Sequence, residues 1–270
     1  MPSKKHNYIT DIILIALGLL CLAPLVYMVV TSLNNSYSSY AISFDPRNFT
    51  LEHYISVLTN KKMVRALFNS IVYSGGAVIL TLVYSCLAGY AFAKMNFKGA
   101  NVIFFLMIMT LMIPMEVTLV PRYLIIKELH WLNSFKALIL TAPGVFGVFL
   151  MRQAMLSIPK ELIESARMDG CGDLRILWSI VLPLVRSAML MLVIFTFLVT
   201  WNGFLWPLIV STKQEMYTLP LAIATLKENN DVNVGADMAK ACLSFLPPFL
   251  LYLVLQKRFV EGVSMTGMKG

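Results

Sequence analysis

Long apolar runs, separated by shorter polar intervals, dominate this chain from end to end. A helix that crosses a bilayer needs about 20 predominantly apolar residues. The runs that approach this length predict six spanning helices, over residues 10–32, 68–93, 101–120, 137–156, 186–210 and 239–257. The pattern therefore predicts an all-α membrane protein with six transmembrane helices and both chain ends on the same side.

The first apolar run fits two interpretations, a retained helix and a cleaved signal peptide. A signal peptide has an apolar core of about 7–15 residues that ends at a small-residue cleavage site. Here the apolar residues continue from Ile12 through Pro24 to Val30, which is longer than such a core. We therefore predict a retained transmembrane helix that also targets the chain to the membrane.

Basic residues beside the first run predict its orientation. Lys4 and Lys5 precede it, and no Lys or Arg follows it before Arg47. Because Lys and Arg accumulate on the cytoplasmic side, both termini are predicted to be cytoplasmic. The predicted organisation is a first helix with an external segment over 1–66, a membrane core over 67–260 and a cytoplasmic tail over 261–270.

The polar interval Pro159–Pro183 lies on the same side as the amino terminus and is predicted to form two short helices. Proline suits the first helical position, because it lacks an N–H that would have no partner there. Leu162, Ile163, Ala166 and Met168 place apolar groups at helical spacing on one face of the first helix. A compact amphipathic element of this kind is typical of a docking site.

A turn at Gly170 is predicted to separate these two helices. Glycine adopts positive φ at little cost, and Asp173 can begin the second helix by accepting backbone N–H bonds. The apolar positions that follow, up to Pro183, are Leu174, Leu177, Trp178 and Val181.

Composition and charge narrow the function classes. Hydrophobic residues make up 58% of the 270 residues and charged residues 13%, whereas soluble domains are about 45–50% apolar. The net charge of +8 raises the alternative of a nucleic-acid partner, but the basic residues are scattered between apolar runs. They are better explained as cytoplasmic flanks of membrane helices, so no nucleic acid is expected.

Candidate catalytic and metal chemistry is absent from the sequence. No Gly-x-x-x-x-Gly-Lys-Ser/Thr loop occurs, so ATP is not expected to bind through a P-loop in this chain, and we predict no bound cofactor. The histidines are far apart and the cysteines lack C-x-x-C spacing, so we predict no catalytic or metal site and treat the cysteines as small hydrophobic residues. These residues are His6, His53, His130, Cys21, Cys86, Cys171 and Cys242.

Few polar side chains lie at membrane depth. Glu116 is the acid nearest to it, between Pro114 and Pro121, which are expected to bend or break the third span. It is either a substrate or gating residue or an interfacial acid paired with a base such as Arg122. Asn202 needs a partner in lipid. Trp201 and Trp206 are expected near the outer end of the fifth span, as an aromatic belt with a helix break.

The nearly uncharged spans argue against a secondary carrier, because proton-coupled carriers keep acids or histidines within several spans. A transporter of this composition has to take its energy from another protein. We expect that protein to bind at the interval Pro159–Pro183. A membrane scaffold that uses this interval as a passive docking site is the alternative from another class.

One motif in this interval resembles a known family. Glu164, Ser165 and Ala166 are followed at fixed spacing by Gly170 and then by Ile180-Val181-Leu182-Pro183. This arrangement resembles the EAA loop of ABC importer permeases, in which Glu-Ala-Ala precedes Gly and Ile-x-Leu-Pro. Asp169 before the glycine also matches, and Ser165 in place of alanine is the one departure.

Further segments are similar to carbohydrate-uptake permeases of the MalG-like class, and also to glycerol-3-phosphate importer permeases. They are Asn69-Ser70, Met112-Ile113-Pro114, the stretch Trp201–Pro207 and the Gly-x-Lys-Gly end. The resemblance implies the type I ABC importer permease fold, a bacterial inner-membrane location, and import of an oligosaccharide or related sugar. It also implies a MalF-like second permease, two ABC ATPase subunits that bind ATP, and an extracellular solute-binding protein.

The resemblance also implies roles for individual residues. The EAA loop would be a coupling helix seated in a groove of the ATPase, with Glu164 bonding at the rim and Leu162, Ala166 and Met168 filling the groove. The coupling set is Glu164, Ser165, Ala166, Asp169, Gly170, Ile180, Leu182 and Pro183. The candidate residues of the substrate pathway are Asn69, Glu116, Asn202 and Trp206.

Overall fold

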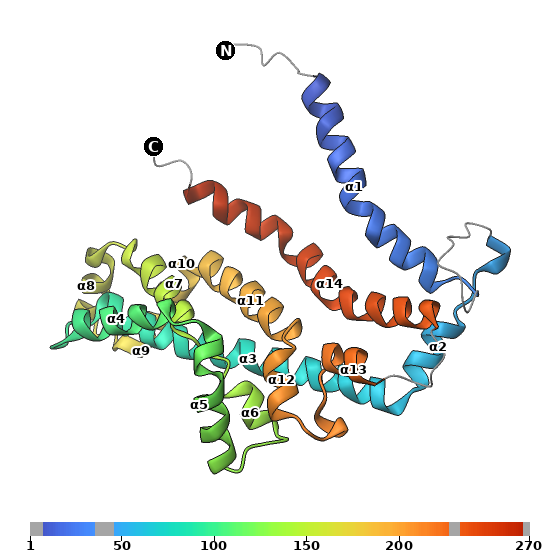
Figure 1. Ribbon diagram of the computed structural model, residues 1–270. Coiled ribbons are helices and arrows are strands. Elements are labelled where there is room, and N and C mark those ends of the chain that lie inside the picture. The colour runs from blue at the N-terminus through green and yellow to red at the C-terminus, as the bar shows by residue number, and fades with distance from the viewer. Residues whose placement is uncertain (1–7, 36–45, 227–232, 267–270) are drawn as a thin grey trace. The chain divides into compact units, whose positions relative to one another are not determined.

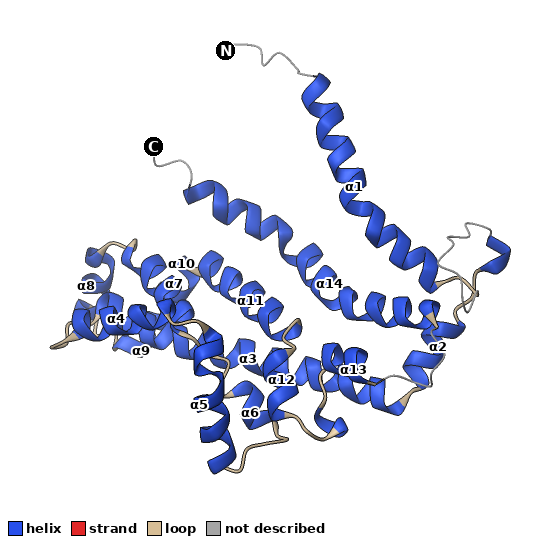
Figure 2. Cartoon of the chain, in the orientation of Figure 1, coloured by secondary structure: helices blue, strands red, loops and turns tan. Residues whose placement is uncertain are grey.

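The computed structural model describes residues 8–35, 46–226 and 233–266. Within these ranges the regular elements are helical, apart from an isolated bridge between Asn34 and Phe49, as Figure 2 shows. In chain order (Figure 1) the elements are α1 (Tyr8–Ser32), η1 (Pro46–Asn48), α2 (Glu52–Thr59), α3 (Lys61–Lys94), α4 (Ala100–Met109), η2 (Thr110–Met112), α5 (Met115–Glu128), α6 (Phe135–Ile139), α7 (Val145–Leu156), α8 (Lys160–Met168), α9 (Asp173–Ile176), η3 (Leu177–Val181), α10 (Leu182–Leu184), α11 (Arg186–Trp201), α12 (Leu205–Val210), η4 (Gln214–Met216), α13 (Leu219–Thr225) and α14 (Val234–Thr266).

Three helices in the described ranges are long and apolar enough to cross a membrane. They are Thr10–Ser32 within α1, the whole of α3, and Val234–Gln256 within α14. Two bent helix pairs raise the number to five if each pair counts as one span. The helices predicted over 10–32, 68–93 and 239–257 are therefore confirmed as elements, although α3 and α14 are longer than predicted.

The third predicted span is broken in the middle. A bend of 105° separates the helical stretch Ala100–Met112 from α5. Ile113 is extended, with φ −83° and ψ 117°, because the ring of the following Pro114 excludes the helical conformation at this position. The break expected at Pro114 is confirmed, whereas α5 continues through Pro121.

Two other predicted spans are also divided into pieces. The stretch 137–156 was expected to be one helix, but it contains the end of α6, a connection, and the twelve-residue α7. The stretch 186–210 is divided between α11 and α12, with a break at Asn202–Phe204. The helix break expected near Trp201 and Trp206 is confirmed by the break at Asn202–Phe204. The break within 137–156 was not predicted, because its connection is nearly as apolar as the helices beside it.

The flanking segments contain more helix than their polarity suggests. The segment 33–66, predicted as polar and external, includes α2 and the start of α3, and α14 continues to Thr266 through the start of the predicted tail. Residues 1–7, 36–45, 227–232 and 267–270 lie outside the described ranges, and the last of these is the whole Gly-x-Lys-Gly end.

The chain divides into two compact units, residues 1–64 with 223–246, and residues 65–222 with 247–270. In the first unit, polar side chains hold the end of α1 to α2. The hydroxyl groups of Ser32 and Tyr54 are 2.6 Å apart, and Nε2 of the buried His53 lies 3.0 Å from the carbonyl oxygen of Asn34. The thiol of Cys242 lies 3.7 Å from the Ser32 hydroxyl.

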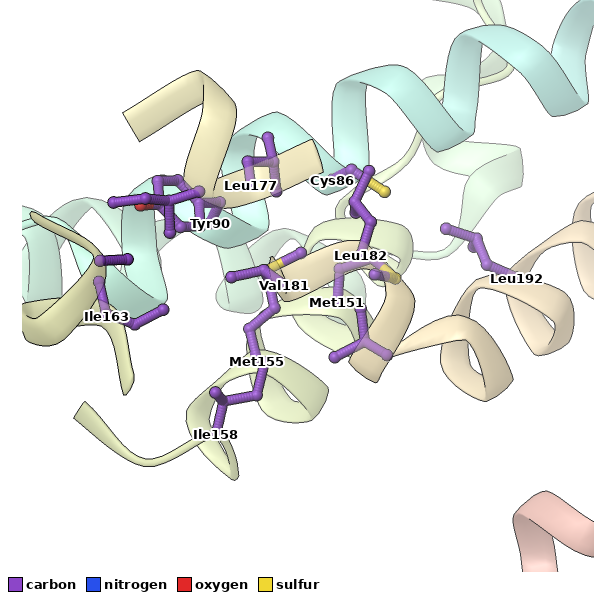
Figure 3. Packing of buried hydrophobic residues seen from close by; sticks show 13 residues of the cluster. Cys86, Tyr90, Met151, Met155, Ile158, Ile163, Leu177, Val181, Leu182 and Leu192 are labelled. Carbon is purple, nitrogen blue, oxygen red and sulfur yellow. The ribbon is translucent and has the colours of Figure 1, made fainter. Parts of the chain in front are cut away.

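The second unit contains two apolar cores. One gathers residues of α3, α7 and the interval 159–185, and Figure 3 shows its side chains converging. The other packs α3, α5, α6 and α12 together, with Leu138, Val210 and Trp206 buried at its centre. Both cores use the same long helix, α3, so this helix is the frame of the unit.

Small residues on α3 allow α7 to approach closely. A Cβ atom added at Gly89 would lie 2.8 Å from Cβ of Met151 and 3.0 Å from the backbone nitrogen of Arg152. Gly147 of α7 is similarly crowded by the Ser85 side chain. Small residues at such positions let the backbones of two membrane helices approach closely.

Gly89→Ala is expected to destabilise the protein. Its methyl group would push against a backbone atom, which cannot move away as a flexible side chain can, and overpacking of this kind costs about 1–3 kcal/mol. Gly75→Ala, on the same helix, is the control, because nothing lies within 4 Å of its added Cβ. Thermal unfolding of the purified protein in detergent should show a lower Tm for Gly89→Ala only; equal Tm values would contradict the close approach.

Candidate functional site

The interval 159–183 forms a chain of short helical pieces, α8, α9, η3 and α10, between α7 and α11 (Figure 1). Pro159 precedes α8 as its N-cap residue, with φ −56° and ψ 139°, rather than opening the helix as expected. The second predicted helix is interrupted, because α9 passes into the π-helical η3 before α10. The prediction of two helices around a turn is otherwise confirmed.

Gly170 ends α8 in a Schellman motif. Its φ is +80°, and its N–H donates to the carbonyl oxygen of Arg167 while the N–H of Cys171 donates to that of Ala166, both at 3.0 Å. These are the two bonds that satisfy free carbonyl groups at a helix end when the residue after the C-cap is left-handed. Because an added Cβ would meet nothing within 4 Å, glycine is required here for its conformation and not for space.

One face of the interval is buried in the first core of the second unit. Ile163 and Ala166 of α8 and Ile176 of α9 pack in this core together with Tyr90 of α3 and Met155 of α7, and Figure 3 shows Ile163, Tyr90 and Met155. All five side chains are buried. The inward face therefore fastens the interval to α3 and α7.

The opposite face is apolar and exposed. Met168 is 87% exposed, Leu174 is 67% exposed and Trp178 is 64% exposed, and Leu162 is also exposed. The predicted common face is confirmed for Ile163 and Ala166, which are buried in the same core, but not for Met168, whereas Leu162 is 42% exposed. We call Leu162, Met168, Leu174 and Trp178 the apolar surface of the loop.

The motif residues are divided between these faces. Glu164, Ser165, Asp169, Gly170 and Pro183 are exposed, whereas Ala166 and Leu182 are buried and Ile180 is intermediate. Ala166 therefore cannot fill a groove on another protein, as was expected of it. Within the described residues the carboxylates of Glu164 and Asp169 form no hydrogen bond or ion pair, so both are free to face a partner.

Asp173 has a different role from the one predicted. Its side chain does not cap α9. Instead Oδ1 accepts hydrogen bonds from Nη2 of Arg167 at 2.8 Å and from the hydroxyl of Tyr90 at 3.0 Å. The bond with Arg167 lowers the pKa of Asp173, and the same bond raises the pKa of Arg167, so the link persists at neutral pH and is lost only in acid.

Two further bonds hold the flanks of the interval to the end of α3. The ammonium group of Lys94 donates to the carbonyl oxygen of Ile158 at 2.6 Å. The Nε–H of Arg152 donates to the carbonyl oxygen of Phe92 at 3.2 Å, and the guanidinium group of Arg152 lies 4.0 Å from the ring centroid of Phe104. The partners of Lys94 and Arg152 are about sixty residues away in the chain, so no local pattern in the sequence indicates these bonds.

Asn69 and Ser70 are buried anchors for a distant segment. The side-chain amide of Asn69 donates to the carbonyl oxygens of Glu215 at 2.8 Å and Tyr217 at 2.9 Å. The hydroxyl of Ser70 accepts from the N–H of Leu219 at 2.7 Å, at the start of α13. The structure thus gives Asn69, expected in the substrate pathway, a packing role in this subunit.

Trp206 also has a packing role. Its indole N–H donates to the carbonyl oxygen of Ala137 at 3.1 Å, and the guanidinium group of Arg122 lies 4.3 Å from the ring centroid. Trp201 is buried too and stacks on Phe197. The interpretation of Trp201 and Trp206 as an exposed interfacial belt is therefore wrong.

Glu116 and Asn202 are the exposed members of the expected pathway set. Glu116 lies in the first turn of α5, where the helix dipole favours a carboxylate. The expected pairing with Arg122 is wrong, because Arg122 donates to the carbonyl oxygen of Thr141 and covers Trp206. Asn202 caps the end of α11 and its side chain donates to the carbonyl oxygen of Leu198 at 3.0 Å.

The cysteines are unpaired in the structure. Cys86 is buried, Cys171 and Cys242 are half-buried, and Cys21 is exposed. Within the described ranges, no group of three or more His, Cys, Asp or Glu side chains is arranged to hold a metal ion.

Comparison with known proteins shows the family of this chain. Residues 85–264 match the family described as binding-protein-dependent transport system inner membrane component. The chain is 33% identical over 260 residues to the arabinooligosaccharides transport system permease protein AraQ of Bacillus subtilis, covering 94% of this chain and 92% of the relative. It is also 33% identical over 200 residues to the sn-glycerol-3-phosphate transport system permease protein UgpE of Yersinia pestis, covering 73% and 71%.

A solved structure has the same fold. The chain superimposes on a subunit of a bacterial ABC transporter involved in the import of the acidic polysaccharide alginate, with a TM-score of 0.83 and 24% sequence identity. The match covers 96% of this chain and 99% of that chain.

Gly170→Ala is expected to loosen the turn between α8 and α9. An alanine held at φ +80° is strained by roughly 1–2 kcal/mol. The turn can relieve this strain only if its two capping hydrogen bonds break. Hydrogen exchange at the amides of Gly170 and Cys171 should become faster. Gly172→Ala is the matched control, since Gly172 has φ −76° and open space around it; unchanged exchange in Gly170→Ala would contradict the assigned cap.

Proposed function

This chain belongs to the family of binding-protein-dependent transport system inner membrane components, and from that membership we propose that it is the permease subunit of an ATP-driven carbohydrate importer. Similar proteins are named as permeases for arabinooligosaccharides, diacetylchitobiose and sn-glycerol-3-phosphate. The chain itself would not be an enzyme, because ATP would be bound and hydrolysed by separate ATPase subunits. It would form half of the translocation pathway.

The exposed surface of the loop 159–183 is the observation that carries this proposal. Its inward face is fixed to α3 and α7 by burial, so its outward face is presented rigidly. The apolar surface of the loop would fill a groove of an ATPase subunit, and the unpaired Glu164 and Asp169 would bond at the rim. Exposed apolar groups rimmed by charge are typical of a protein interface.

The arrangement in the membrane follows from this role. We infer six crossings, in which α4 with α5, α6 with α7, and α11 with α12 each provide one broken span between the continuous α1, α3 and α14. Both termini and the loop 159–183 would then be cytoplasmic. The complete importer would contain a MalF-like second permease, two ATPase subunits and an extracellular binding protein, and ATP-driven closure of the ATPases would displace the loop.

The substrate pathway is proposed to pass the broken spans rather than the straight ones. Glu116 and Asn202 are exposed beside the breaks at Pro114 and Gly203, and breaks at membrane depth occur where backbone lines a cavity. Asn69 and Trp206 would support this pathway from within the subunit, through the buried bonds described above.

An oligosaccharide is favoured over glycerol-3-phosphate as the transported solute. The similarity to the arabinooligosaccharide permease covers 94% of this chain, whereas the similarity to the glycerol-3-phosphate permease covers 73%. A bacterial host that lacks the gene for this chain should lose uptake of radiolabelled arabinotriose and keep uptake of glycerol-3-phosphate. Loss of glycerol-3-phosphate uptake alone would reverse the assignment, and normal uptake of both would support a scaffold.

Glu164→Lys is expected to weaken attachment of the ATPase. The substitution reverses a charge at the proposed rim, and like charges placed against each other across an interface cost several kcal/mol. The ATPase subunit should therefore be lost from the complex when the permease is purified in detergent. Glu161→Lys makes the same charge change one turn away on α8 and is the control; equal ATPase recovery from the two variants would contradict the role of Glu164.

A further inference from the structure

A single carboxylate oxygen joins three separate elements beneath the loop. Oδ1 of Asp173, in α9, accepts from Arg167 of α8 and from Tyr90 of α3. The ring of Tyr90 is 3% exposed and lies in the same apolar core as Ile163 and Ile176. The hydroxyl of Tyr90 therefore reaches the edge of this core, where it meets the half-exposed ion pair.

Among the described residues, this group provides the only hydrogen bonds from α8 and α9 to α3. In the described part of the chain, no other hydrogen bond or ion pair joins α8 or α9 to that helix. The bonds from Lys94 and Arg152 attach the preceding segment instead. Apolar contacts resist separation but have no preferred direction, so the bonds to Asp173 are what fix the position of α8 along the axis of α3.

The other end of α3 is also fixed by polar bonds. Asn69 and Ser70 hold the backbone at Glu215, Tyr217 and Leu219, as described above. Twenty-one residues separate Asn69 from Tyr90, which corresponds to about 31 Å along an α-helix. The helix continues through the intervening glycines, and Gly76 packs directly against Ile139.

We propose that Tyr90, Asp173 and Arg167 are positioning residues that make α3 the transmission rod between the coupling loop and the segment 214–219 at the far end of the second unit. This inference rests on the proposed function, in which an ATPase displaces the loop. A shift of α8 would be passed through Asp173 to Tyr90, along α3, and then through Asn69 and Ser70 to the segment before α13.

The link is suited to fixing position rather than to adding stability. The side chains of Arg167 and Asp173 are 46% and 41% exposed, and exposed ion pairs contribute little to folding because water screens them. Loss of the link should therefore leave the complex folded and assembled while it loosens the connection between the loop and α3.

Tyr90→Phe tests the proposal, because it removes one hydroxyl and keeps the buried ring. The complete importer, with its second permease, ATPases and binding protein, is reconstituted in vesicles with whichever of arabinotriose and glycerol-3-phosphate the wild type imports. The expected result is ATP hydrolysis that continues while uptake falls, so that the ATP consumed per solute imported rises about fivefold or more. Asp173→Asn should change this ratio in the same direction.

The controls separate this role from a general loss of structure. Tyr84→Phe removes a hydroxyl from an exposed position on the same helix and should leave the ratio unchanged. Combining Tyr90→Phe with Asp173→Asn should raise the ratio no further than Asp173→Asn alone, since both interrupt one connection.

The outcomes distinguish the two proposals. A wild-type ratio in Tyr90→Phe would overturn the link while leaving the proposed function intact, and this includes the case in which uptake and hydrolysis fall in proportion. Additive effects in the double variant would also overturn it. A wild-type complex that imports neither solute would contradict the proposed function, and the link with it.

Discussion

The attachment of the loop 159–183 to the end of α3 is the interaction on which the rest of this subunit depends. Burial of Ile163, Ala166 and Ile176 holds the loop against α3 and α7, the bonds to Asp173 fix its position, and Lys94 attaches the segment before it. With the inward face held in this way, the outward face can be both apolar and exposed without collapsing onto its own chain. A loosely held loop of this composition would bury Met168 and Trp178 and leave nothing for a partner to bind.

Local signals in the sequence were sufficient to predict where helices end when a single residue decides the backbone geometry. Gly170 was expected to end a helix at positive φ, and Pro114 was expected to break one, and both do so. The spacing of the EAA-like motif identified the family before any contact was known. Hydropathy gave less information about whether a span is continuous, because the short helices α7 and α11 are about as apolar as unbroken spans.

Roles that depend on distant partners could not be predicted from the sequence. Asp173 was expected to cap its own helix, yet it binds Tyr90, which is 83 positions away. Asn69 and Trp206 were expected in the substrate pathway, and the structure adds that the amide nitrogen of Asn69 and the indole nitrogen of Trp206 donate to backbone carbonyl groups of distant segments. Even the division of α8 into two faces required the structure, since a helix of nine residues offers several apolar stripes.

The shortness of α7 has a consequence for how the protein is made. Twelve residues span about 18 Å, well short of the hydrocarbon thickness of about 30 Å, so α7 has no stable place in lipid by itself. The close approach of α7 to Gly89 shows that α3 provides part of its protein environment. We therefore expect α7 to be stable in the bilayer only once it has packed against α3, rather than as an independent helix.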